Sequence, residues 1–162
     1  MRIFARIMIS AVFFLGISCG VYTFSPSALG GIKSIAIPLF ENQTLESGVA
    51  EKLTDALAEE FVADNTLRVV PEGRSDSILR GSVVSYGRDA YTYDESEAVS
   101  EYIVRIEVDV QFVESKSDKI IWEERLSNWG TYESASETEE TGQDNAIIKL
   151  VEDILNRTVK GW

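Results

Sequence analysis

Cys19 is the only cysteine among 162 residues, and its position makes it the first candidate for chemistry. It follows an apolar run, residues 7–17, which Arg2 and Arg6 precede. A positive start, a short apolar stretch and small residues at its end are typical of a secretory signal peptide. The run is too short to span a bilayer, which takes ~20 apolar residues. A lone cysteine has no internal disulfide partner, so we predict that residues 1–18 are removed as a lipoprotein signal peptide and that Cys19 carries lipid.

One position departs from the usual lipoprotein signal. Leucine commonly stands three residues before the lipidated cysteine, whereas this chain has Gly16 there and Leu15 one residue earlier. The alternative is an ordinary signal peptide that is cleaved elsewhere, with Cys19 inside its apolar region. Lipidation predicts more than one acyl chain on Cys19, palmitate among them, because a single chain holds a protein to a membrane only marginally.

Cations and aromatic residues near predicted loops are the other candidates for binding. Lys116, Lys119 and Arg88 are cations that could meet an anionic ligand, although a solvated turn is the simpler explanation. Aromatic side chains on strands could form a binding patch, but they more often pack in a core or on a sheet. The aromatic candidates are Tyr86, Tyr91, Tyr93, Trp122 and Trp129.

Composition argues against catalysis and against nucleic acid. The chain has no histidine, which removes the usual general base and the commonest metal ligand. It has no glycine-rich phosphate loop, no metal-ligand spacing and no Gly-x-Ser-x-Gly motif. Removing residues 1–18 removes two arginines and no acid, which leaves 13 basic and 27 acidic residues and a net charge of −14. We therefore expect no cofactor, no metal and no nucleic-acid partner. A hydrolase that uses carboxylates alone stays open, and it needs two carboxyls roughly 5–10 Å apart in a cleft.

Apolar periodicity predicts the elements that would position these residues. Repeats of about four residues predict amphipathic helices over residues 45–64 and 144–159. Strict alternation over residues 101–114 predicts a strand with one buried and one wet face, as in an antiparallel sheet. Further strands are predicted over residues 32–40, 67–70, 77–86 and 119–132, a polar turn over 41–44, a loop or ragged hairpin over 87–100, and a mobile linker over 133–143.

This order of elements favours an α+β fold. We predict a two-layer sandwich, in which a mostly antiparallel or mixed sheet of about four to five strands carries both helices on one face. The predicted organisation is a signal peptide at residues 1–18, a lipidated tether at 19–31 and a single domain at 32–162.

Several short motifs resemble the LptE family of lipopolysaccharide-assembly lipoproteins. Residues 19–24 read Cys-Gly-Val-Tyr-Thr-Phe, similar to the Cys-Gly-Tyr-x-Phe start of the mature family proteins, with Val21 as an extra residue. The similarity continues over residues 32–42, which read Ile-Lys-Ser-Ile-Ala-Ile-Pro-Leu-Phe-Glu-Asn. It then covers residues 51–57, 67–70, 79–81 and 122–123.

The resemblance implies a non-enzymatic outer-membrane lipoprotein that faces the periplasm. Such a protein plugs and helps to assemble the LptD β-barrel translocon, and it binds lipopolysaccharide on its way to the cell surface. The resemblance also implies an α/β sandwich. Lys116, Lys119 and Arg88 are then the candidate lipopolysaccharide contacts, chosen on charge alone. The alternative function is a periplasm-facing lipoprotein that scaffolds or activates a cell-wall or secretion complex.

Overall fold

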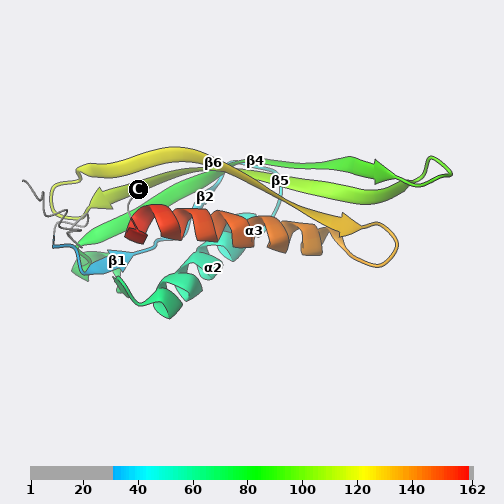
Figure 1. Ribbon diagram of the computed structural model, residues 1–162. Helices are drawn as coiled ribbons and strands as arrows, with labels where there is room; N and C mark the ends of the chain where they lie inside the picture. Colours follow the sequence, from blue (N-terminus) through cyan, green and yellow to red (C-terminus); the bar gives the residue numbers. More distant parts are fainter. Residues whose placement is uncertain (1–30, 161–162) are drawn as a thin grey trace, which may run out of the picture.

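A mixed sheet and two helices form the two layers of the structure, a computed structural model that describes residues 31–160 (Figure 1). The predicted signal peptide and Cys19 lie outside the described residues. The helices are α2 (Val49–Asp64) and α3 (Glu139–Leu155), with a short 3-10 turn at Glu72–Arg74 and a π-helical end at Asn156–Lys160. The strands are β1 (Ser34–Ala36), β2 (Glu41–Asn42), β3 (Arg68–Val69), β4 (Ser77–Tyr93), β5 (Val99–Glu114) and β6 (Ile120–Glu133).

The long strands β4, β5 and β6 form an antiparallel meander, which makes up most of the sheet. The sheet order is β3-β1-β4-β5-β6, with β1 parallel to both of its neighbours. The two-residue strand β2 pairs in parallel with β4 further along. Figure 1 shows both helices on one face of this sheet, so the predicted α+β two-layer fold is confirmed.

Alternation along β5 determines which face of the meander is buried. Val104, Ile106, Val108, Val110 and Phe112 point toward the helices and are fully buried, as the sequence predicts. Side chains between them point to the opposite face, because successive side chains of a strand alternate.

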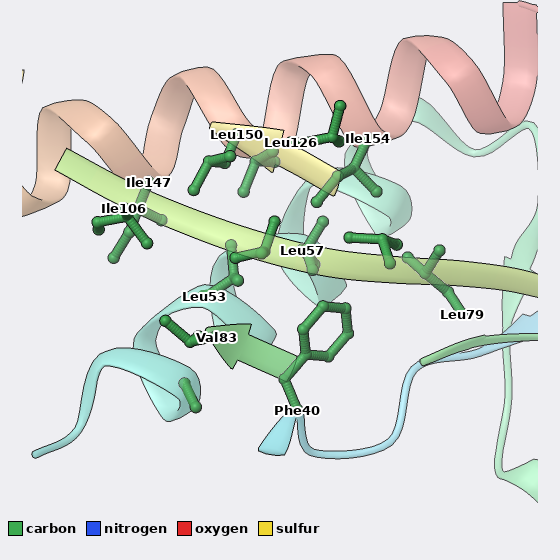
Figure 2. Close-up of a cluster of buried hydrophobic side chains, with 14 of the residues drawn as sticks. Phe40, Leu53, Leu57, Leu79, Val83, Ile106, Leu126, Ile147, Leu150 and Ile154 are labelled. Carbon is green, nitrogen blue, oxygen red and sulfur yellow. The ribbon is translucent and has the colours of Figure 1, made fainter. Parts of the chain in front are cut away.

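The core lies between the sheet and the two helices. Leu53 and Leu57 of α2 meet Leu150 and Ile154 of α3 above the strands, and Figure 2 shows these side chains converging with Phe40. All four aliphatic side chains are fully buried, and burial of each is worth about 1.5–3 kcal/mol relative to exposure. The predicted helical faces are therefore confirmed.

Several predicted boundaries are wrong. Of the strand predicted over residues 32–40 only Ser34–Ala36 forms β1, and the helix predicted from residue 45 begins at Val49. Residues 41–42, predicted as part of a turn, form β2, whose side chains are exposed and give no apolar pattern. For residues 87–100 the loop alternative is wrong and the ragged-hairpin alternative is confirmed. Residues 87–93 and 99–100 continue β4 and β5, only residues 94–98 connect them, and three register shifts interrupt the pairing. The predicted linker at 133–143 already contains the first turns of α3. The buried residues of these turns are Gly142 and Gln143, so the sequence shows no apolar pattern there.

The β4–β5 hairpin extends well beyond the helical layer. Figure 1 shows its tip projecting past the N-terminal end of α3. The strands there carry exposed residues on both sides, including Tyr91 and Tyr93. The far end of the meander is therefore a two-sided surface, whereas its middle has only one exposed face.

Candidate interaction surfaces

The open face is the side of β4, β5 and β6 that points away from the helices. Strand register arranges its side chains in cross-strand rows, such as Ser82–Asp109–Arg125. The rows in the middle of the face are polar, because the wet positions of β5 are Arg105, Glu107, Asp109 and Gln111.

One arginine–carboxylate pair lies in the middle of the open face. The Arg125 guanidinium donates two hydrogen bonds to Asp109, through Nε to Oδ1 and Nη2 to Oδ2, each 2.7 Å. These hydrogen bonds hold the pKa of Asp109 below its usual range. A bidentate arginine–carboxylate pair is well oriented but contributes little stability at an exposed position.

A groove of about 490 Å³ lies beside this pair, with the exposed Leu39 on its rim. Its polar side chains also satisfy one another: Arg80 Nε donates to Gln111 Oε1 at 3.2 Å, and Gln111 Nε2 donates to Glu123 Oε1 at 2.6 Å. Arg80 also lies 3.4 Å from Asp118. The groove is therefore polar, but its one arginine, Arg80, already contacts neighbouring side chains.

Two exposed aromatic rings meet at the far end of the open face. Trp129 and Tyr91 have centroids 6.3 Å apart at an interplanar angle of 33°, and they are 42% and 51% exposed. Lys149 of α3 reaches around the edge of β6, where its Nζ lies 3.9 Å from the Trp129 ring centroid and donates to the Trp129 carbonyl at 2.8 Å. The lysine both orients the ring and satisfies an edge-strand carbonyl.

A second polar cluster lies on the helix side of the sheet, at the start of α3. Tyr86 donates from its hydroxyl to Glu139 Oε1 at 2.9 Å, and Arg88 Nη1 donates to Glu139 Oε2 at 3.2 Å. Burial and the Glu139 carboxylate together raise the pKa of Tyr86 well above its ordinary value. Arg88 also lies over the Tyr102 ring, 4.9 Å from its centroid. This cluster fixes the hairpin to α3.

The structure does not bring the three predicted cations together. Arg88 stands opposite Val104, whereas Lys116 and Lys119 belong to the turn after Glu114. At ~3.3 Å per residue, roughly 33 Å of strand separates them. Arg88 is also engaged by Glu139, and the binding role of all three cations stays a prediction.

The aromatic candidates divide between the two faces. Tyr91 and Trp129 form the patch on the open face, and Tyr93 is 63% exposed near the hairpin tip. Trp122 instead packs beside Phe112 on the helix side, with centroids 6.4 Å apart. Sequence reasoning missed Arg105 and Lys149, which flank Trp129 only because of strand register and helix packing.

The described part of the chain offers little for catalysis. Within residues 31–160, no three histidine, cysteine, aspartate or glutamate side chains cluster as metal ligands. The adjacent carboxylates of β6 point to opposite faces: Glu123 accepts from Gln111 on the open face, while Glu124 accepts from Arg157 Nη2 at 2.8 Å. Neither helix between residues 31 and 160 has the length and apolar character needed to cross a membrane.

Comparison with known proteins gives one family and several similar folds. The family model described as LptE, lipopolysaccharide-assembly, matches residues 32–158, nearly the whole described chain. No curated protein sequence matches the chain.

Solved structures with this fold include three bacterial proteins of low sequence identity. Protein XCC0632 from Xanthomonas campestris is 12% identical with a TM-score of 0.61, and the match covers 79% of this chain and 84% of that one. A minor lipoprotein from Acinetobacter baumannii is 15% identical with a TM-score of 0.53 and coverages of 80% and 94%. Lipoprotein GNA1162 from Neisseria meningitidis is 14% identical with a TM-score of 0.50 and coverages of 80% and 99%. At these identities the similarity shows a shared fold.

Proposed function

Because the chain belongs to the LptE family of lipopolysaccharide-assembly proteins, we propose that it plugs and helps to assemble an LptD-type β-barrel translocon. Membership in this non-enzymatic family supports a role in lipopolysaccharide transport. The finer proposal is that the protein sits within the barrel and takes part in moving lipopolysaccharide to the cell surface. Cys19 would anchor it by lipid to the periplasmic face of the outer membrane.

The open face is the observation that carries the plug proposal. Its central side chains are polar and paired with one another, as in the Arg125–Asp109 and Gln111–Glu123 contacts. Large barrels enclose a polar, water-containing lumen. A surface whose charges are already satisfied can stand in such a lumen without desolvating unpaired groups.

The helix layer also suits an enclosed, wet position. The exposed positions of α2 are mostly acidic, and Lys52 joins the two helices by contacting Glu140 at 2.5 Å and Asp144 at 3.2 Å. The exposed large apolar residues of the helices, Val62 and Ile148, are isolated positions, and charged residues outnumber them. Both faces of the protein are therefore suited to hydrated contacts.

Photo-crosslinking from both faces in intact cells tests enclosure. A crosslinking residue at Ser127 samples the open face, and one at Asp55 samples the outer surface of α2. A plug surrounded by one barrel predicts that both positions crosslink to the same β-barrel protein. Crosslinks from one face only would show docking on the side of the barrel and would contradict enclosure.

A mild-detergent pulldown through a C-terminal tag tests the identity of the partner. A large β-barrel protein recovered at about one to one is the expected result. Recovery of a cell-wall synthase or a secretion component without a barrel would overturn the plug proposal, and it would favour an anchored scaffold or activator instead.

A further inference from the structure

We propose that residues 21–24 of this chain, Val-Tyr-Thr-Phe, dock on an apolar row at the near end of the open face. The near end is the end of the sheet that carries β1, opposite the hairpin tip (Figure 1). Docking there holds the predicted lipid anchor at Cys19 close to the folded domain. The inference goes beyond the proposed function, because it concerns two parts of one chain and requires no barrel.

Four apolar residues stand side by side across four strands at the near end. Strand register pairs Ala36 with Ile78, Ile78 with Val113, and Val113 with Ile120. This row lies on the open face, because Val113 follows Asp109 at an even spacing along β5 and alternate residues of a strand share a face. The rows in the middle of the face are polar, so the near end differs from them in chemistry.

Part of the row is buried and part is exposed. Its members on β1, β4 and β5 form a buried cluster of their own, separate from the core between the sheet and the helices. On β6, Ile120 is 47% exposed and its neighbour Ile121 is 39% exposed. Leu39 is 62% exposed and lines the adjoining groove beside Arg80. Exposed apolar side chains around a buried apolar cluster mark an interaction site.

The chain upstream of β1 starts within reach of this row. Gly31 has a φ of 95°, a left-handed conformation that glycine adopts readily and that lets the chain change direction before β1. Phe24 precedes Gly31 by seven residues, which span at most ~25 Å. Ala36 follows Gly31 by five residues, at most ~18 Å, and the row is about 14 Å wide at ~4.8 Å per strand. Phe24 can therefore reach the row, whereas Tyr91, about 43 Å along β4 from Ile78, is too distant.

The composition of residues 21–24 matches the row. Three of the four are apolar, and β-branched and aromatic residues favour an extended backbone. In an extended segment Tyr22 and Phe24 project to the same side, so both rings can pack on the exposed apolar residues of β6 and of the groove rim. The segment carries no charge, since Arg6 and Lys33 are the nearest charged residues on either side. A second copy of the protein is a poorer occupant, because two acidic chains repel each other.

Docking places the lipid anchor at the near end of the sheet. Only Gly20 separates Cys19 from the docked segment, so the anchor lies within about 7 Å of it. An undocked tether from Cys19 to Gly31 has twelve residues and spans up to ~43 Å. The docked segment therefore holds the near end at the membrane surface and directs the hairpin tip away from it.

The test measures whether residues 21–24 shield Ile120 in the full-length lipoprotein in detergent. Lipidation consumes the Cys19 thiol, so I120C supplies the reactive thiol for maleimide labelling. Y22S/F24S should raise its labelling rate about tenfold, because the two rings that cover it are lost. I148C is the matched control, since Ile148 is an exposed isoleucine of α3, on the other side of the sheet. The same double substitution should leave the control rate within about twofold.

Three outcomes would overturn the docking. An unchanged labelling rate of I120C in the Y22S/F24S background is the first. Equal acceleration of I120C and I148C is the second, because it would show a general loosening of the fold. The third is protection of I120C that survives the double substitution but requires the copurified barrel protein. That result would assign the row to the barrel, and it would support the proposed plug.

Discussion

Replacing Gly130 by alanine should destabilise the fold, because α3 lies directly against β6 at this position. A Cβ at Gly130 would lie 2.6 Å from Asn145 Cβ and 2.9 Å from the Ala146 backbone nitrogen, and it would overlap the Gly142 carbonyl oxygen. Backbone atoms of a helix cannot yield as a flexible side chain does. The substitution therefore requires the whole helix to shift away from the strand.

The structure sets the size of the effect. Overpacking of a core contact costs about 1–3 kcal/mol, and clashes with backbone belong at the upper end, about 2–3 kcal/mol. For a domain of this size each kcal/mol lowers the melting temperature by roughly 2–4 °C, so we expect a drop of about 4–12 °C. Gly130 is not among the residues with positive φ, so the loss comes from packing and not from backbone strain.

Thermal and urea unfolding followed by circular dichroism measure this loss. Gly87→Ala is the matched control, since Gly87 lies in the same sheet and a Cβ there meets nothing within 4 Å. The control should change stability by less than about 0.5 kcal/mol, because surface substitutions of this kind have small effects. Equal melting temperatures for Gly130→Ala and Gly87→Ala would refute the close helix–strand contact.

Three further predictions concern single contacts. Arg125→Gln should raise the pKa of Asp109 toward its ordinary value, as followed by carboxyl NMR. The pair's stabilisation is complete above the unfolded pKa of Asp109 and is lost as pH falls through the lowered folded pKa, and it is small because both side chains are exposed. Glu139→Gln should lower the pKa of Tyr86 only part of the way back, since burial remains, as followed by phenolate absorbance. Leu150→Ala should cost about 2–5 kcal/mol in urea unfolding, because the side chain is fully buried between the helices and the sheet.

Sequence periodicity was sufficient to predict the elements that bury one whole face. The alternation from Tyr102 to Phe112 identified β5 and its buried side, because each residue on that side faces the helices. The repeat of Leu53, Leu57 and Phe61 identified the buried stripe of α2 in the same way. These patterns reflect the sheet–helix interface directly, so the α+β fold followed from them.

Elements that are fixed by close backbone contact left no such pattern. The first turns of α3 bury Gly142 beside Tyr132 and Val104, where a Cβ would lie 2.9 Å and 3.1 Å from their side chains. In the sequence alone, Gly142 and Gln143 indicate a polar linker, although both residues are buried. Gly81 of β4 is another close approach, since a Cβ there would lie 2.6 Å from Phe40 Cε2 and would overlap the Asp109 carbonyl oxygen.

The candidate surface depends on register, which the sequence alone does not give. The residue opposite an arginine on the neighbouring strand decides whether that arginine has a carboxylate partner. Arg125 stands opposite Asp109, and Arg105 stands opposite Trp129 and Gly87. A one-residue shift in either pairing would exchange the two faces and remove the distinction.

The excess of acidic residues is concentrated in the helical layer. Helices α2 and α3 carry ten acidic residues and two lysines, so much of the net negative charge lies in the layer on the other side of the sheet from Arg105. Salt screens exposed charges over about 8 Å at physiological ionic strength, and packed layers are separated by about 10 Å. An exposed charge on the open face therefore responds mainly to its own row and the neighbouring rows. If this is correct, reversing acidic charges on the outer surface of α2 should leave the pKa of Asp109 nearly unchanged, whereas Arg125→Gln should raise it.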